Sequence, residues 1–127
     1  MSFRPPRTRP ILSIFHNPKC SKSRAALQLL NSHTDPPYQV DVIDYLSDPP
    51  TPDQLRQVSN YLGTVQGMLR SDAPKVDTVG QLIDLVKKDP SVLERPVVVD
   101  WDKGKAVIGR PTSDAVERLI KDRLSDA

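Results

Sequence analysis

The chain has 127 residues, of which 37% are hydrophobic and 27% are charged, and its formal net charge is +2. This length allows one compact domain with a real hydrophobic core. The small net charge gives no reason to expect a nucleic-acid or membrane partner, and no apolar run approaches the roughly 18 residues of a membrane-spanning helix. A single cysteine, Cys20, excludes an internal disulfide and a multi-cysteine metal site, so we expect no bound metal and a location in the reducing cytoplasm.

Residues 1–10 form a basic segment that we interpret as a disordered tail. The segment contains three arginines and two adjacent prolines, and no acidic residue precedes Asp35. An acid-free start with several arginines also resembles a mitochondrial presequence. The prolines oppose the amphipathic helix that import requires, so the cytoplasm remains the expected location. Residues 11–127 then form a single folded domain.

Residues 11–45 predict a strand, a helix and a second strand. Residues 11–15 are a short β-prone apolar run, and residues 38–45 alternate between polar and apolar side chains. Between them, a helical pattern follows Cys20. The residues expected on the inward face of this helix are Ser23, Ala26, Leu27 and Leu30. Such a unit has parallel strands joined by a right-handed crossover.

The middle of the chain predicts three helices. Thr51 and Gln54 fit a capping box that opens the first helix, and Gly63 is its expected end. A short helix is expected over residues 65–69. A second capping box, over residues 78–81, opens the third helix.

The last part of the chain predicts a β-hairpin and a final helix. Residues 97–99 form a strand, and the turn at residues 102–104 leads into residues 105–108. Thr112 or Ser113 would cap the last helix. The order strand–helix–strand, helical insertion, strand–strand–helix is that of an α/β thioredoxin-like fold with a mixed four-stranded sheet, flanking helices and a helical insertion.

Cys20 lies where the first predicted strand gives way to a helix, and this position favours a reactive thiolate. The free N–H groups at the start of a helix and the helix dipole both stabilise a thiolate over a thiol. Lys19, Lys22 and Arg24 add positive charge nearby. Ser23 could donate a hydrogen bond to the sulfur. We therefore expect a lowered pKa and a nucleophilic sulfur at neutral pH, although lone cysteines are often small buried hydrophobic residues instead.

Two other kinds of cysteine loop do not fit the sequence. A low-molecular-weight phosphatase loop needs a longer spacing between its cysteine and its arginine than the three residues between Cys20 and Arg24. A dithiol oxidoreductase needs Cys-x-x-Cys, and residue 23 is a serine. Cys20 must therefore obtain a second thiol from outside the chain.

The loop His16-Asn-Pro-Lys-Cys-Ser-Lys-Ser-Arg24 resembles the signature loop of the glutaredoxin-dependent arsenate reductases, a thioredoxin-fold family related to the Spx-type regulators. Four further segments carry the resemblance in the same order: Asp44-Tyr-Leu46 with Pro49-Pro-Thr51, Met68-Leu-Arg70, Glu94-Arg-Pro-Val-Val98 and Gly109-Arg-Pro111. Together they extend the resemblance over residues 11–124.

The resemblance implies an enzyme that reduces arsenate to arsenite. Cys20 would attack arsenate, glutathione would resolve the adduct as co-substrate, and glutaredoxin would recycle the cysteine, with no bound cofactor. Arg70, Arg95 and Arg110 match the arginines that hold the oxyanion in the family. Guanidinium groups suit this task because they neutralise charge while they orient oxygens. Taken singly, each arginine could equally be an ordinary residue at the end of a helix or strand.

The resemblance also implies supporting roles around the thiol. Pro96 matches the cis-proline of the thioredoxin fold, which faces the cysteine loop. His16 matches a histidine that supports the thiolate or has a packing role. Asn17, Ser23 and Arg24 complete the set of supporting residues.

Other functions remain open at this point. A glutathione-linked thiol transferase would use Cys20 but would not need three arginines. An Spx-like binding protein would contact RNA polymerase, but Ser23 removes the Cys-x-x-Cys switch of such proteins. A catalytically silent adaptor would have an ordinary, high pKa at Cys20. The arsenate reductase hypothesis predicts arsenate or a similar oxyanion, glutathione and glutaredoxin as the partners.

Overall fold

The computed structural model describes residues 9–33 and 36–125. Its elements are β1 (Ile11–His16), α1 (Ser21–Leu30), β2 (Gln39–Asp44), α2 (Pro52–Leu62), the 3-10 helix η1 (Gln66–Met68), α3 (Val79–Lys88), the 3-10 helix η2 (Pro90–Val92), β3 (Val97–Asp100), β4 (Lys105–Ile108) and α4 (Asp114–Ser125). Most of the tail predicted over residues 1–10 lies outside the described residues. None of the described helices is long and apolar enough to span a bilayer.

The four strands form one mixed sheet in the order β2-β1-β3-β4. β1 pairs with β2 in parallel, and α1 makes the crossover between them. β1 pairs with β3 in the antiparallel sense, as β3 does with β4. The mixed four-stranded sheet, the parallel pair and the C-terminal hairpin predicted from the sequence are therefore confirmed.

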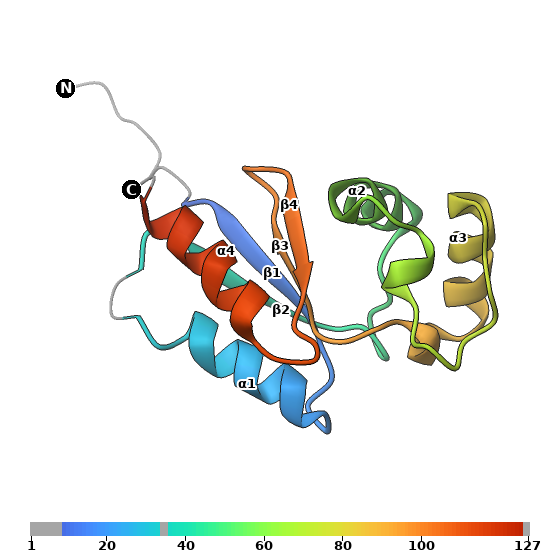
Figure 1. The fold of residues 1–127 in the computed structure, drawn as a ribbon, viewed down its shortest axis with the longest axis horizontal. Coiled ribbons are helices and arrows are strands. Elements are labelled where there is room, and N and C mark those ends of the chain that lie inside the picture. Colours follow the sequence, from blue (N-terminus) through green and yellow to red (C-terminus); the bar gives the residue numbers. More distant parts are fainter. Residues whose placement is uncertain (1–8, 34–35, 126–127) are drawn as a thin grey trace.

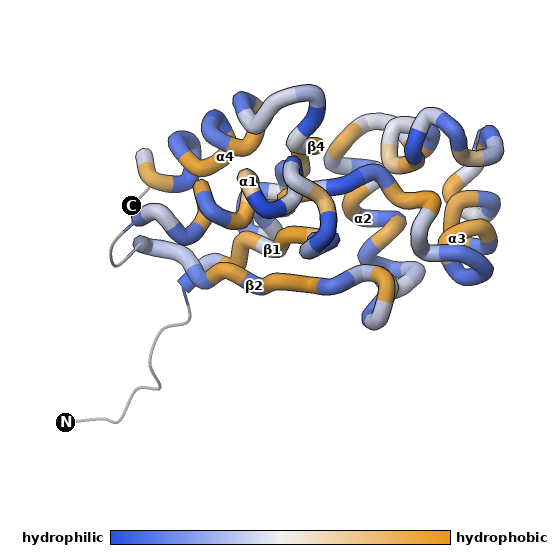
Figure 2. Tube along the Cα trace, turned by 90° about the horizontal axis from the view of Figure 1, so that it is seen from below, coloured by the Kyte–Doolittle hydropathy of each residue, from blue (hydrophilic) through white to orange (hydrophobic). Residues whose placement is uncertain are grey.

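The sheet lies between two layers of helices, because successive side chains of a strand point to opposite faces. On one face, Leu12, Ile14 and Val98 pack with α1 and α4. On the other face, Phe15 and Val97 pack with the helices of the insertion, α2 and α3. Figure 1 shows α1 and α4 lying against the sheet and the insertion on the opposite side. Figure 2 shows hydrophobic residues along β1 and along β2, the strand at the edge of the sheet.

Local sequence signals determine the ends of the insertion's helices. Thr51 forms the predicted capping box at the start of α2, and Gly63 ends this helix in the left-handed region with φ of 74°. The capping box that opens α3 is also present. The helix predicted over residues 65–69 is shorter, a 3-10 turn over Gln66–Met68, because Leu69 leaves it in an extended conformation to bridge Leu93.

A buried ion pair at the turn of the hairpin was not predicted. Arg123, near the end of α4, donates to both carboxylate oxygens of Asp100, at 2.9 Å each, and to Asp102 at 3.0 Å. The side chains of Arg123 and Asp100 are only 7% and 1% exposed. The pair fixes the last turn of α4 to the hairpin.

Candidate active site

Cys20 lies at the N-cap of α1, at the end of a short loop that follows β1. Asn17 shapes this loop, since its backbone oxygen accepts from the N–H of Cys20 at 2.9 Å and its side chain accepts from the N–H of Lys19 at 3.0 Å. The backbone oxygen of Cys20 accepts from Arg24 in the first turn of α1, at 3.0 Å. The thiol is thus fixed where a helix begins and remains partly exposed.

Several groups act on the Cys20 thiol, and together they lower its pKa to about 7. Burial is the largest single influence and raises the pKa, while hydrogen bonds from the backbone of Ser23 and Lys22 lower it. A hydrogen bond from the Arg95 side chain and the charge of Arg110 lower the pKa further. A thiol with this pKa is about half ionised at neutral pH and is a competent nucleophile.

The Arg110 side chain reaches the sulfur directly, from the far end of the chain. Its Nη2 donates to Sγ of Cys20 at 3.1 Å, across 90 positions of sequence. Its Nε donates to the backbone oxygen of Arg95 at 2.6 Å and pairs with Oε1 of Glu94 at 3.1 Å. The guanidinium therefore lies between a thiolate and a carboxylate.

Arg95 approaches the sulfur from the segment that precedes β3. The peptide bond between Arg95 and Pro96 is cis, as the resemblance implied, and the bond between Arg110 and Pro111 is cis as well. The Arg95 side chain lies close enough to the Cys20 thiol to lower its pKa. Its Nε is buried and has no hydrogen-bond partner, so this guanidinium has a spare donor beside the thiol.

Arg70 follows η1, in a segment that is bonded to the approach to β3. Its backbone N–H donates to the oxygen of Val92 at 2.8 Å, which holds the segment after η1 beside the approach to β3. Its side chain is 37% exposed and pairs with Asp72 at 3.3 Å. No hydrogen bond joins Arg70 to Cys20 among the described residues.

His16 is buried at the end of β1, opposite Asp44 of β2. Burial lowers the pKa of His16, the Asp44 carboxylate opposes this shift, and the charge of Arg24 adds to it. Its Nδ1 has no hydrogen-bond partner. Within the described residues no hydrogen bond joins His16 to Cys20, so a packing role fits His16 as well as a role at the thiolate.

The polar neighbours of Cys20 act differently from what their sequence positions indicated. The Ser23 hydroxyl is buried and accepts from the N–H of Asn17 at 3.3 Å, and it is the backbone of Ser23 that lowers the pKa of Cys20. The Arg24 guanidinium donates to the oxygen of Pro18 at 2.9 Å and fixes the loop. The side-chain charges that lower the pKa of Cys20 come from other segments of the chain.

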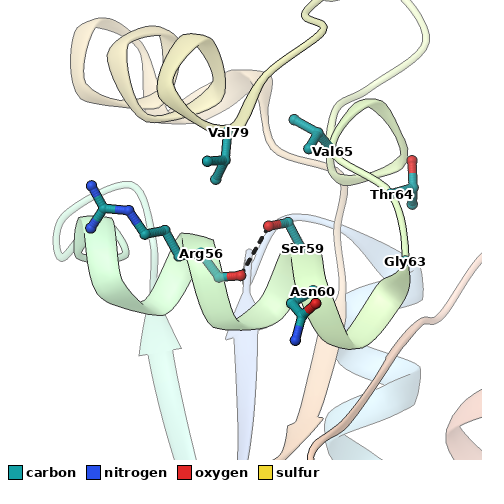
Figure 3. Close-up of a pocket in the computed structure, with 7 residues that line it drawn as sticks. All are labelled: Arg56, Ser59, Asn60, Gly63, Thr64, Val65 and Val79. Atoms are coloured by element: carbon teal, nitrogen blue, oxygen red, sulfur yellow. Dashed lines mark hydrogen bonds between the residues drawn. The ribbon is translucent and has the colours of Figure 1, made fainter.

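A separate pocket of about 520 Å³ lies on the insertion, between α2 and the start of α3, and is lined by Arg56, Ser59, Asn60, Gly63, Thr64, Val65 and Val79 (Figure 3). The Ser59 hydroxyl already donates to the oxygen of Arg56 at 3.0 Å. None of the lining residues belongs to the site around Cys20. Within residues 9–33 and 36–125, no three His, Cys, Asp or Glu side chains gather to hold a metal ion.

The family described as "Protein of unknown function (DUF1687)" matches residues 3–109. An arsenate reductase of Neisseria meningitidis (serogroup A / serotype 4A) is 39% identical over 114 residues, which cover 80% of this chain and 92% of that protein. An arsenate reductase of Escherichia coli K12 is 33% identical over 99 residues, which cover 69% of this chain and 67% of that protein.

A solved structure, "Arsenate reductase from Vibrio cholerae", matches with a TM-score of 0.72 at 30% identity, over 87% of this chain and 98% of that one. The chain belongs to the arsenate reductase family, and also to the DUF1687 family. Its fold is the predicted thioredoxin-like α/β fold, and the segment from α2 to η2 is the helical insertion. The relation to Spx-type proteins stays a prediction.

Two residues beside the site of this arsenate reductase family member were given no role from the sequence. Glu94 pairs with Arg110. Tyr45 is fully buried, and its hydroxyl has no hydrogen-bond partner. Burial raises the pKa of Tyr45, while the Asn17 side chain and the charge of Arg95 oppose the shift, which places the hydroxyl beside the site. Both residues lie in segments that carried the family resemblance, and this was their only signal.

Proposed function

We propose that this protein reduces arsenate to arsenite through a covalent adduct on Cys20, with glutathione as co-substrate and glutaredoxin as the recycling partner. One observation carries the proposal: Arg110 Nη2 donates to Cys20 Sγ at 3.1 Å, so a guanidinium, a group suited to binding an oxyanion, is in direct contact with the thiol. The names and identities of the relatives support arsenate as the substrate. The cytoplasm, where thiols are kept reduced, is the proposed location.

The first step is attack of the Cys20 thiolate on arsenic(V). A bond forms between sulfur and arsenic, and one arsenate oxygen leaves as water after it is protonated. Attack on an anion by a thiolate is opposed by charge repulsion, and the guanidinium groups of Arg95 and Arg110 offset this repulsion. The spare Nε of Arg95 is a donor that a bound oxyanion can satisfy.

The second step reduces the arsenic. A glutathione thiolate attacks the adduct, and its sulfur and that of Cys20 end in a mixed disulfide. The two electrons that the thiolates lose convert arsenic(V) to arsenic(III), which leaves as arsenite. Because the described chain holds one cysteine, it cannot resolve this disulfide itself, and thiol–disulfide exchange with glutaredoxin and a second glutathione restores the thiol.

The proposal is tested by arsenate-dependent oxidation of NADPH in the presence of glutathione, glutaredoxin and glutathione reductase. Turnover should vanish in Cys20→Ser and fall about 100-fold in Arg95→Ala, the typical cost of one lost oxyanion donor. Arg118→Ala, which removes an exposed arginine on α4, serves as the matched control and should turn over like wild type.

Absence of turnover in the folded, reduced wild-type protein would refute arsenate reduction. The assay is therefore run beside a second one, in which a glutathionylated peptide replaces arsenate. Activity on the peptide alone, insensitive to Arg95→Ala, would assign the protein to the thiol transferases instead. Activity in neither assay would leave a binding protein.

A further inference from the structure

The guanidinium of Arg110 has two contacts at Nε in addition to its contact with the thiol. Its Nε faces the backbone oxygen of Arg95 at 2.6 Å and the carboxylate of Glu94 at 3.1 Å. Its Nη2 donates to Sγ of Cys20 at 3.1 Å. A guanidinium is planar and rigid, so contacts at Nε fix the direction in which Nη2 points.

Glu94 is itself fixed, which makes it a firm anchor for a neighbour. Its backbone N–H donates to the oxygen of Met68 at 2.8 Å, and Oε1 also accepts from the N–H of Arg95 at 3.2 Å. The preceding residue, Leu93, is buried and bridges Leu69. The Glu94 side chain is only 23% exposed, so both its backbone and its carboxylate are held in place.

A carboxylate is an unexpected neighbour for such a site. Its negative charge opposes ionisation of a nearby thiol and disfavours a bound oxyanion. Considered as a charge alone, Glu94 should raise the pKa of Cys20 and weaken oxyanion binding. Considered as an anchor for Arg110, it has the opposite effect, since it holds a cation against the sulfur.

We propose that Glu94 is a positioning residue, which fixes the Arg110 guanidinium so that Nη2 faces the sulfur of Cys20 and the oxyanion bound there. The part of this inference that concerns the oxyanion rests on the proposed function. The part that concerns the thiol does not, because the contact between Arg110 and Cys20 exists without any substrate. The two ideas can therefore fail separately.

The test measures the rate at which iodoacetamide alkylates Cys20 in the free protein, as a function of pH. With the anchor removed in Glu94→Ala, the pKa of Cys20 should rise, and alkylation at pH 6 should slow about three- to tenfold. Glu94→Gln keeps an oxygen that can accept from Arg110 and Arg95, so its profile should stay at the wild-type position or slightly below it. If Glu94 acted only through its negative charge, its removal in Glu94→Ala would lower the pKa of Cys20. The sign of the pKa change in Glu94→Ala therefore distinguishes positioning of Arg110 from a simple charge effect.

Two controls make the result specific. Asp122→Ala removes the same charge and breaks an ion pair of 3.2 Å with Lys105, at the other end of β4 from Arg110, and should leave the profile unchanged. In an Arg110→Ala background, Glu94→Ala should no longer raise the pKa, because its partner is gone.

An unchanged or lowered pKa in folded Glu94→Ala would overturn the proposal, and so would a rise that persists without Arg110. The proposed function is judged separately, by arsenate turnover. If Cys20 is alkylated as expected in all variants but arsenate is not turned over, Glu94 remains a positioning residue and only the arsenate assignment fails.

Discussion

Arginines lie at both ends of the β3–β4 hairpin, Arg123 of α4 at the turn end and Arg95 and Arg110 at the open end, and they differ in what they contact. At the turn end, the guanidinium of Arg123 is buried against Asp100 and also bonds Asp102. At the open end, Arg110 donates to the Cys20 sulfur, and Arg95 keeps a buried Nε without a partner. Both ends belong to the same hairpin (Figure 1).

The difference separates a structural arginine from one that is ready for a ligand. A buried donor without a partner costs free energy in the free protein. At the turn end this cost is avoided, because carboxylates accept the hydrogen bonds of Arg123. At the open end the unpartnered Nε of Arg95 lies beside a thiolate, where a bound oxyanion can accept its hydrogen bond. The comparison predicts that substitutions at the turn end change stability and that those at the open end change chemistry.

The largest expected effect is on stability, at the turn end. Asp100→Ala leaves the Arg123 guanidinium buried without its main partner and should lower the free energy of unfolding by about 3–5 kcal/mol. Urea denaturation at pH 7 measures this. The alkylation profile of Cys20 should not change in the fraction that remains folded.

The matched control for Asp100→Ala is Asp53→Ala, which breaks the ion pair with Arg56. This pair is 3.1 Å long and largely exposed, whereas the pair between Arg123 and Asp100 is 2.8 Å long and buried. An exposed pair contributes no more than about 1 kcal/mol. Equal losses of stability in the two variants would remove the distinction between the two ends of the hairpin.

The next effect is on reactivity, at the open end. Arg110→Ala removes a cation and a hydrogen bond from the thiolate and should raise the pKa of Cys20 by about one unit. Stability should change little, since the Arg110 side chain is 34% exposed. The pH dependence of alkylation and urea denaturation measure the two quantities on the same samples. A large loss of stability with an unchanged pKa would make Arg110 structural, like Arg123.

The pH dependence of the wild type gives the third prediction. Alkylation of Cys20 should rise about tenfold per pH unit below 7 and level off above it, since the thiol titrates with a pKa of about 7. Folding lowers this pKa from 9.0, so ionised Cys20 contributes stability that is fully present above pH 9 and is lost as the pH falls through 7. The free energy of unfolding of wild type relative to Cys20→Ser should therefore decrease from pH 9 to pH 6. A flat difference over this range would contradict the lowered pKa.

Local signals explain what the sequence predicted well. The capping box at Thr51, the stop at Gly63 and the strand before Cys20 depend on neighbouring residues, and the structure has each of them. The position of Cys20 at the start of α1 is local too, and the backbone groups of Ser23 that lower its pKa follow from it.

Contacts between distant segments explain what the sequence left out. Lys19 and Arg24 are neighbours of Cys20 in sequence, yet the side-chain charges that lower its pKa belong to Arg95 and Arg110. Only the family resemblance placed these two arginines at the site. Nothing in the sequence pattern pairs Glu94 with Arg110, because that contact exists only once the hairpin has formed.

The smallest expected effect comes from Tyr45, which is part of the core like Arg123 but has an unpartnered polar group like Arg95. Its ring packs in the core with Leu55 and Val97, but its hydroxyl lacks a hydrogen-bond partner beside Arg95. Tyr45→Phe keeps the ring and removes the unsatisfied group, so it should raise the free energy of unfolding by about 1 kcal/mol.

Thermal and urea unfolding of Tyr45→Phe measure this gain, with Tyr61→Phe as the control. The Tyr61 hydroxyl bonds Gln57 at 3.3 Å at the surface, so its removal should not stabilise the protein. A loss of stability in Tyr45→Phe would mean that the hydroxyl is satisfied in solution. In that case Tyr45 would belong with Arg123, among the polar groups whose hydrogen bonds the fold itself satisfies, and the buried Nε of Arg95 would remain as a donor for the oxyanion.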